Sequence, residues 1–237
     1  MVYDFALEGW APDNNASAEC MWKLEIWGPE LELLRAQSAS EREWLVFYDS
    51  SQMWGLPGAA KFLGVHVARD RDHRSVRVEA REAPTEALAQ RWLIASGAQP
   101  DALARKAGLP EPADEESRRI ESHIRDSGVR YHVEAHHTDH QHQHTWALLR
   151  DTAPDVARPW VAQTERSVNR GTGGAYLIRE ERFTARSAAL EWVRASEHRH
   201  HRAQAATSRC EHGGPSPTSP TATTASANTA HLGRART

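Results

Sequence analysis

Alternating apolar and polar residues mark strands in the first half of the chain. Residues 21–27, MWKLEIW, place tryptophan, leucine and isoleucine on one side and lysine and glutamate on the other, as a half-buried strand does. Aromatic and branched residues predict a strand over 43–49, and 61–70 with 75–81 is typical of a hairpin. Residues 29–42 fit a strand or a helix equally well, so their structure stays open.

Helix signals follow this hairpin. Thr85 suits an N-cap, an apolar stripe comes after it, and Gly97 closes the predicted helix. Residues 99–107 indicate a short second helix with proline in its first turn. A third helix over 113–127 has acidic residues first and arginines later, as the helix dipole prefers. Because its apolar stripe is thin, we expect it to lie on the surface as a connector.

The strand pattern then starts again. Alternation over 129–135 predicts a first strand of the second half, and three more strands are expected at 145–151, 158–167 and 176–182. Thr184 caps a helix that carries a second apolar stripe. The second half therefore repeats the order of the first, strands followed by a capped helix.

The two halves also align residue by residue. Residues 75–96 lie over 175–196 without a gap, and two upstream strands align as well. The aligned pairs are Trp92 and Trp192, Trp44 and Trp146, Asp49 and Asp151, Leu24 and Val133, and Glu25 and Glu134. The alternative is that two unrelated sheets both end in a helix because that arrangement packs well.

The sequence thus predicts an α+β protein made of two divergent tandem copies of a small antiparallel sheet of about four strands. Each sheet is closed by a C-terminal helix, and Trp92 and Trp192 are the expected core anchors, whose loss should cost about 3–5 kcal/mol. The expected segments are a lead segment (1–20), a first repeat (21–97), a helical connector (98–128), a second repeat (129–198) and a disordered tail (199–237).

The composition limits the classes of protein to which this chain can belong. The last forty residues are dense in proline, serine, threonine and alanine, which predicts disorder. The net charge of -3 does not suit a dedicated polyanion binder. Cys20 and Cys210 form no disulfide framework, the N-terminus has no leader pattern, and no apolar run approaches the roughly 20 residues that cross a bilayer. A cytoplasmic protein is expected.

Histidines are concentrated in residues 131–144, YHVEAHHTDHQHQH. On a regular strand, His132, Glu134 and His136 share one face, and His140 or His142 in the adjoining turn would add a ligand. Two imidazoles and a carboxylate suit a divalent metal such as zinc. The competing interpretation is a solvated hairpin, since these positions lie on the polar side of the strand.

Other chemistry has little support in the sequence. No nucleophile elbow or phosphate-binding loop is present, and the glycines at 171–174 suit a hairpin turn. Residues 103–110 resemble a helix-turn-helix segment, but acidic residues follow where a recognition helix should approach phosphate. The second copy resembles a double-stranded-RNA-binding domain in element order but lacks the lysine cluster of that domain.

The function expected from these observations is that of a soluble, non-enzymatic binding or accessory protein that binds a protein or small ligand through its sheet surfaces. The candidate contact residues are the tryptophans at positions 10, 27, 54 and 160. The first alternative is a zinc-type site in the histidine-rich hairpin, and the second is weak nucleic-acid binding. No cofactor other than such a metal is expected, and no membrane partner.

Overall fold

The computed structural model describes residues 3–53, 58–141, 143–168 and 174–212. The chain divides into two compact units, residues 1–201 and 202–237, and the second of them holds the end of the last helix. Both sheets lie in the first unit.

Each sheet has four long strands and a short parallel strand at one edge. The first sheet consists, in spatial order, of β1 (Ala11–Pro12), β5 (Ser75–Ala83), β4 (Phe62–Asp70), β3 (Arg42–Asp49), β2 (Leu31–Ala39) and β6 (Ala104–Arg105). The second consists of β7 (Glu111–Pro112), β11 (Ala175–Phe183), β10 (Trp160–Ser167), β9 (His144–Asp151) and β8 (Tyr131–Asp139). The predicted fold class, α+β with two sheets of the same order, is confirmed.

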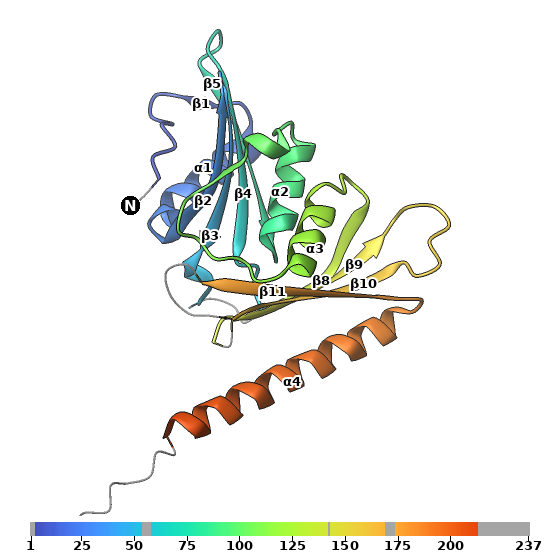
Figure 1. The fold of residues 1–237 in the computed structure, drawn as a ribbon. Coiled ribbons are helices and arrows are strands. Elements are labelled where there is room, and N and C mark those ends of the chain that lie inside the picture. The colour runs from blue at the N-terminus through green and yellow to red at the C-terminus, as the bar shows by residue number, and fades with distance from the viewer. Residues whose placement is uncertain (1–2, 54–57, 142, 169–173, 213–237) are drawn as a thin grey trace, which may run out of the picture. The chain divides into compact units, whose positions relative to one another are not determined.

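Helices form layers on the two sheets (Figure 1). They are α1 (Asn15–Trp27), α2 (Glu86–Ala95), α3 (Glu115–Arg125) and α4 (Arg186–His212), with short 3-10 turns η1 (Gly28–Glu30), η2 (Ser50–Met53) and η3 (Pro100–Ala102). In the first unit, α1 packs on the outer face of the first sheet and the start of α4 on the outer face of the second. Helices α2 and α3 lie together between the sheets, in one core that takes side chains from both. Within the described residues, no helix is both long and apolar enough to cross a membrane.

The two halves also contain matching hydrogen bonds, formed by residues whose numbers differ by 100. The side chain of Asn14 caps α1 by accepting from Ser17 N, and that of Asp114 caps α3 by accepting from Ser117 N. The Ser17 hydroxyl in turn accepts from Val78 N, as the Ser117 hydroxyl does from Ile178 N. Each serine therefore ties its helix to the last long strand of its own sheet.

The aligned tryptophans and aspartates of β3 and β9 also occupy equivalent positions. Trp44 Nε1 donates to the Ser96 carbonyl at the end of α2, and Trp146 Nε1 donates to Glu197 on α4. Asp49 and Asp151 each end a strand and accept from the backbone N–H two residues on, at 3.0 and 3.1 Å. These pairs stabilise the same junctions in both halves.

The segment predicted as the first strand, 21–27, is helical and forms the second half of α1. Its alternation is misleading, because Leu24 is 2 % exposed while Trp22 and Ile26 are 60 % and 52 % exposed. The alignment of Leu24 with Val133 fails for the same reason, since α1 corresponds to α3. The open segment 29–42 is mainly β2, which is the true counterpart of β8.

The secondary structure of residues 98–128 differs from the helical connector that the sequence predicts. Residues 99–107 form η3 and β6 in place of a helix. Helix α3 is not a surface connector, because Ile120 and Ile124 are fully buried in the core between the sheets. The limits 21–97 and 129–198 stay predictions as domain boundaries, although the shared element order begins earlier, at β1 and β7.

The predicted core anchors are half-buried. Trp92 and Trp192 flank the core, whereas their neighbours Leu93 and Val193 are 0 % and 1 % exposed. We therefore expect truncation of either tryptophan to cost less than a fully buried anchor would. Helix α4 extends to His212, past the predicted start of the tail at residue 199, and residues 213–237 lie outside the described part of the chain.

Candidate functional site

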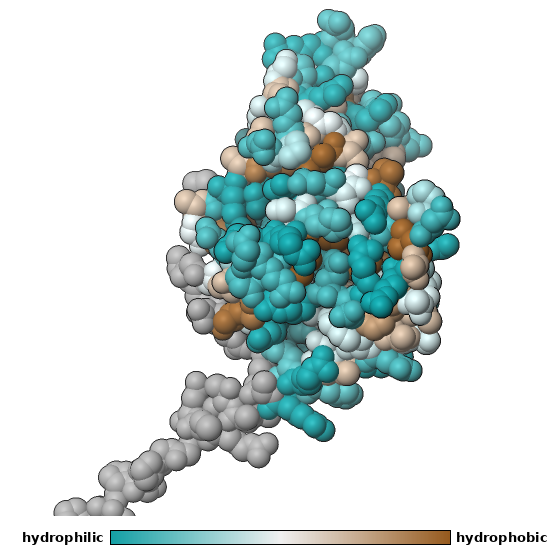
Figure 2. Space-filling model, turned by 45° about the vertical axis from the view of Figure 1, so that its right-hand side comes forward, coloured by the Kyte–Doolittle hydropathy of each residue, from teal (hydrophilic) through white to brown (hydrophobic). Residues whose placement is uncertain are grey.

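Polar residues dominate the face shown in Figure 2, where apolar residues lie in small separate patches. Of the tryptophans proposed as contact residues, Trp10 and Trp27 are partly buried against the core under α1, and Trp160 against the core under α4. Trp54 lies outside the described residues. These side chains therefore serve packing, and a binding site is better sought in the cavities of the first unit.

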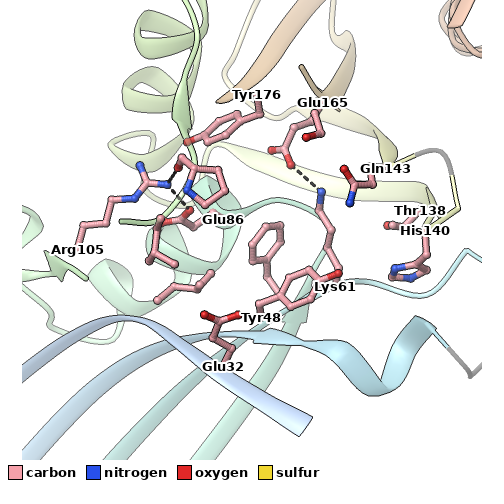
Figure 3. Close-up of a pocket in the computed structure, with 15 residues that line it drawn as sticks. Glu32, Tyr48, Lys61, Glu86, Arg105, Thr138, His140, Gln143, Glu165 and Tyr176 are labelled. Atoms are coloured by element: carbon pink, nitrogen blue, oxygen red, sulfur yellow. Dashed lines mark hydrogen bonds and ion pairs between the residues drawn. The ribbon is translucent and has the colours of Figure 1, made fainter. Parts of the chain in front are cut away.

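A cavity of about 330 Å³ opens between the two sheets. Figure 3 shows that side chains from both halves converge on it. Its apolar wall consists of Leu34, Tyr48, Phe62, Leu109, Pro110 and Tyr176. Its polar wall consists of Glu32, Lys61, Glu86, Arg105, Thr138, His140, Gln143, Glu165 and Ser167.

An ion pair between the two halves crosses this cavity. Lys61 Nζ, just before β4, lies 2.7 Å from Glu165 Oε1 on β10 (Figure 3). The two side chains are 14 % and 7 % exposed, so each is largely removed from water. Since an unpaired charge at such depth is costly, the two charges compensate each other.

A second charged network closes the other end of the cavity. Glu86 at the start of α2 accepts from Arg35 on β2 at 2.5 Å and lies 3.4 Å from Arg105 on β6. The guanidinium of Arg105 also stacks over the ring of Tyr176. The buried cations and carboxylates here are thus already paired with one another.

Tyr176 connects this network to α3. Its hydroxyl donates to Glu121 Oε2 at 2.9 Å. Burial, reinforced by the negative charge of Glu121, raises the pKa of the Tyr176 hydroxyl. Burial likewise raises the pKa of Glu121, with the charge of Glu86 acting in the same direction. Tyr176 is therefore a neutral hydrogen-bond donor.

Two buried polar atoms on the cavity wall, Arg105 Nε and His140 Nε2, have no hydrogen-bond partner among the described residues. The second belongs to an imidazole ring. Burial, and then the nearby charge of Lys61, lowers the pKa of the imidazole, so the ring is neutral at pH 7. A neutral imidazole nitrogen on the cavity wall can bind one polar group of a guest molecule.

The other residues of the predicted metal site lie elsewhere. Glu134 and His136 line a second cavity, and His140 lines the first. His132 Nδ1 lies 3.5 Å from Glu134 Oε1, but its side chain is 68 % exposed. The structure thus separates His140 from the three residues of the strand. His142 lies outside the described residues.

A β-bulge in β8 breaks the predicted alternation. The pairing with β9 shifts between Val133 and Ala135. Val133 packs against the core between the sheets, whereas Ala135 packs under α4. Because residues two apart then change face, His132 and His136 do not share one. The described residues contain no group of three or more histidine, cysteine, aspartate or glutamate side chains placed to hold a metal ion, and the zinc-type site stays a prediction.

Lys61, Glu165 and Tyr176 were not among the predicted site residues. The one sequence signal at Lys61 is that lysine is rare in this chain, whose other cations are mostly arginine. Nothing in the sequence pairs it with a glutamate 104 residues away. No protein-family model, no curated protein and no solved structure matches this chain, so its cavity is interpreted from its own chemistry.

Proposed function

We propose that the protein is a binding protein that takes a small, uncharged molecule with an aromatic body into the cavity between its two sheets. The observation that carries the proposal is the neutral His140 nitrogen without a partner, which lies on the polar wall of a cavity whose other wall is aromatic and aliphatic. A volume of about 330 Å³ lies at the small end of the range typical of ligand pockets, roughly 300–1,000 Å³.

The internal ion pairs support an uncharged guest. An anionic molecule would have to draw Lys61 away from Glu165, and a cationic one would compete for the same carboxylate. Either exchange leaves one buried protein charge without its partner, which costs more than a hydrogen bond returns. A neutral molecule leaves both pairs in place.

The walls define the shape of the guest. Tyr48 and Phe62 contact each other edge to face on the side of the first sheet, and Tyr176 comes from the second. Aromatic surfaces of this kind favour a flat apolar body. One polar group on that body would meet His140, as ligand pockets place a few polar groups among apolar ones.

Three probes of matched shape test the charge preference. Benzamide, benzoate and benzylammonium should be titrated into the full chain at pH 7 while backbone amide NMR signals are followed. We expect benzamide to shift residues around Thr138, His140 and Tyr176 and to bind at least tenfold more tightly than either charged probe. If benzoate or benzylammonium binds more tightly than benzamide, the proposal is wrong.

Two variants place the site. His140→Phe keeps a flat ring but removes the nitrogen, and should weaken benzamide about fivefold, the value of roughly one neutral hydrogen bond. Leu109→Trp fills the cavity and should abolish binding. Val129→Trp adds the same side chain at an 87 % exposed position and should leave binding unchanged. Equal affinity in the Leu109 and Val129 variants would place the probe elsewhere.

A further inference from the structure

Lys61 differs from the other lysines of the chain in its surroundings. The sequence contains three lysines, at positions 23, 61 and 106. Lys23 pairs with Glu19 at 2.7 Å, and its side chain is 41 % exposed. Lys61 pairs with Glu165 at the same distance, but its side chain is 14 % exposed and lines the cavity between the sheets. Lys106 is exposed. Lys61 therefore combines a carboxylate partner with burial on a cavity wall, and the other two lysines do not.

The groups around the Lys61 amine suit a guest with a carbonyl group. Figure 3 shows the side chain reaching toward Glu165, with His140 on the same side of the cavity. Nζ lies 5.2 Å from the centre of the Phe62 ring, and its charge is close enough to His140 to act on that imidazole. In the tautomer that carries its proton on Nε2, His140 can donate to a carbonyl oxygen. A carbonyl group held in this way would lie beside the amine of Lys61.

The ion pair contains the base that the amine needs. An ammonium group has no lone pair, so Lys61 must lose a proton before it can attack a carbonyl carbon. Glu165 Oε1 lies 2.7 Å from Nζ and can accept that proton. The transfer converts two charges into a neutral amine and a neutral carboxylic acid, and burial favours neutral forms over charged ones. No charge is left without a partner at this step.

We propose that Lys61 forms a reversible Schiff base with an aromatic aldehyde or ketone, an inference that rests on the binding of the flat, uncharged guest proposed above. The amine of Lys61 attacks the carbonyl carbon, the Nζ–C bond forms, and the oxygen takes one proton from Nζ to become a carbinolamine hydroxyl. Glu165 then returns its proton to that hydroxyl, the C–O bond breaks, and water leaves. The nitrogen lone pair closes the C=N bond of the iminium.

The charges of the site are the same before and after this reaction. One ammonium and one carbonyl group give one iminium and one water molecule, so no oxidant or reductant is needed. The iminium takes the place of the ammonium beside the Glu165 carboxylate, and the ion pair across the cavity is kept. A lysine amine removed from water is a known type of nucleophile toward carbonyl groups. The site thus selects for carbonyl compounds that carry no charge of their own.

Benzaldehyde is the probe, because it has the shape of benzamide and a reactive carbonyl group. The full chain is treated at pH 7 with benzaldehyde and sodium cyanoborohydride, which reduces an iminium to a stable amine. Mass spectrometry of peptides then measures the benzyl group on each lysine. We expect Lys61 to be labelled at least tenfold faster than Lys23, whose carboxylate partner lies at the same distance.

Competition shows whether the reaction takes place in the cavity. Benzamide forms no Schiff base, and at saturation it should slow the labelling of Lys61 at least tenfold while Lys23 is labelled as before. Leu109→Trp, which fills the cavity, should reduce the rate at Lys61 to that at Lys23. Val129→Trp, at an exposed position, should leave the labelling unchanged.

The remaining outcomes overturn the inference, and they bear differently on the proposed function. If benzamide binds in the cavity but Lys61 is labelled no faster than Lys23, Lys61 is not a nucleophile for the guest, and the binding site stands. If Lys61 is labelled fast while saturating benzamide or Leu109→Trp has no effect, the reaction does not use the cavity, and the inference is wrong. If benzamide does not bind and Lys61 reacts no faster than Lys23, both proposals are wrong.

Discussion

Asp151 shows how one side chain can stabilise a junction of four segments. Its carboxylate is fully buried and accepts from Arg130 at 2.7 and 2.8 Å and from Arg182 at 2.9 Å. Oδ1 of Asp151 also accepts from Ala153 N at 3.1 Å. These hydrogen bonds, those from Arg130 first, hold the pKa of Asp151 well below its usual range.

Asp151→Asn should therefore lower the free energy of unfolding at pH 7 by about 2–3 kcal/mol, less than for a fully buried pair because both arginines are partly exposed. Since the folded-state pKa is depressed, the stabilisation is present above the unfolded value of 3.8 and is lost as pH falls below it. Urea unfolding at pH 7 and at pH 3 measures both effects.

Asp155→Asn is the matched control, because it makes the same change at an exposed position of the same loop. It should stay within about 0.5 kcal/mol of the parent protein. If the Asp151 variant loses as much stability at pH 3 as at pH 7, the ion pair is not the source.

The histidine-rich hairpin can be tested at the same scale. The bulge in β8 separates His132 from His136, so we expect the double variant His132→Ala with His136→Ala to leave the zinc content of tag-free protein unchanged. Elemental analysis after dialysis against zinc measures it. Loss of one bound zinc per chain in this variant would restore the metal hypothesis.

At the scale of elements, strands were predicted well where apolar residues were continuous or flanked by clear turns, as in β3, β4 and β9. The failure at α1 has a physical reason. Only Ser17 and Leu24 of that helix are buried, so its exposed tryptophan and isoleucine imitate a strand face. The matching motif of proline followed five residues later by serine, at Pro12 and Pro112, was the signal that would have found it.

Contact between α2 and the first sheet depends on a residue without a side chain. A Cβ at Gly64 on β4 would lie 2.9 Å from Cε3 of Trp92. Gly64→Ala should therefore destabilise the protein by about 1–3 kcal/mol, measured as a shift in the urea midpoint. The aligned residue on β10 is Ala162, which already has a Cβ, so the second half does not have this requirement for glycine.

A second change distinguishes overpacking from a backbone effect. In a protein that already carries Trp92→Leu, Gly64→Ala should cost much less stability than it does in the parent protein, because the smaller side chain removes the clash. Additive effects of the two substitutions would show that the ring of Trp92 is not what limits residue 64.

For the whole molecule, the cavity itself could not be predicted from the sequence. Its walls come from both sheets, from α2 and from the segment after β6, and His140 is the one predicted site residue among them. Local periodicity gives the faces of individual strands. It does not give the distance between the two sheets, so the Lys61–Glu165 pair appeared only in the structure.

That ion pair should couple the two halves energetically. Glu165→Gln leaves Lys61 without its counter-ion and should lower the free energy of unfolding by about 3 kcal/mol. Lys61→Met together with Glu165→Leu should recover most of this loss, because apolar side chains of similar size can replace a buried pair. Urea unfolding of Lys61→Met, of Glu165→Leu and of the double variant gives the coupling energy, and simple additivity would contradict the interpretation.

The helical layer between the sheets bears on whether either half can exist alone. Helices α2 and α3 share one core with side chains of both sheets, so neither copy has a complete interior of its own. A fragment that ends near residue 98 would present the inner face of α2 to water, and we expect it to aggregate or to lack fixed tertiary packing. The intact chain should unfold in a single transition seen alike by tryptophan fluorescence and circular dichroism. Although the sequence suggests two separate modules, neither half would then fold by itself, and only the two halves together would form a stable domain.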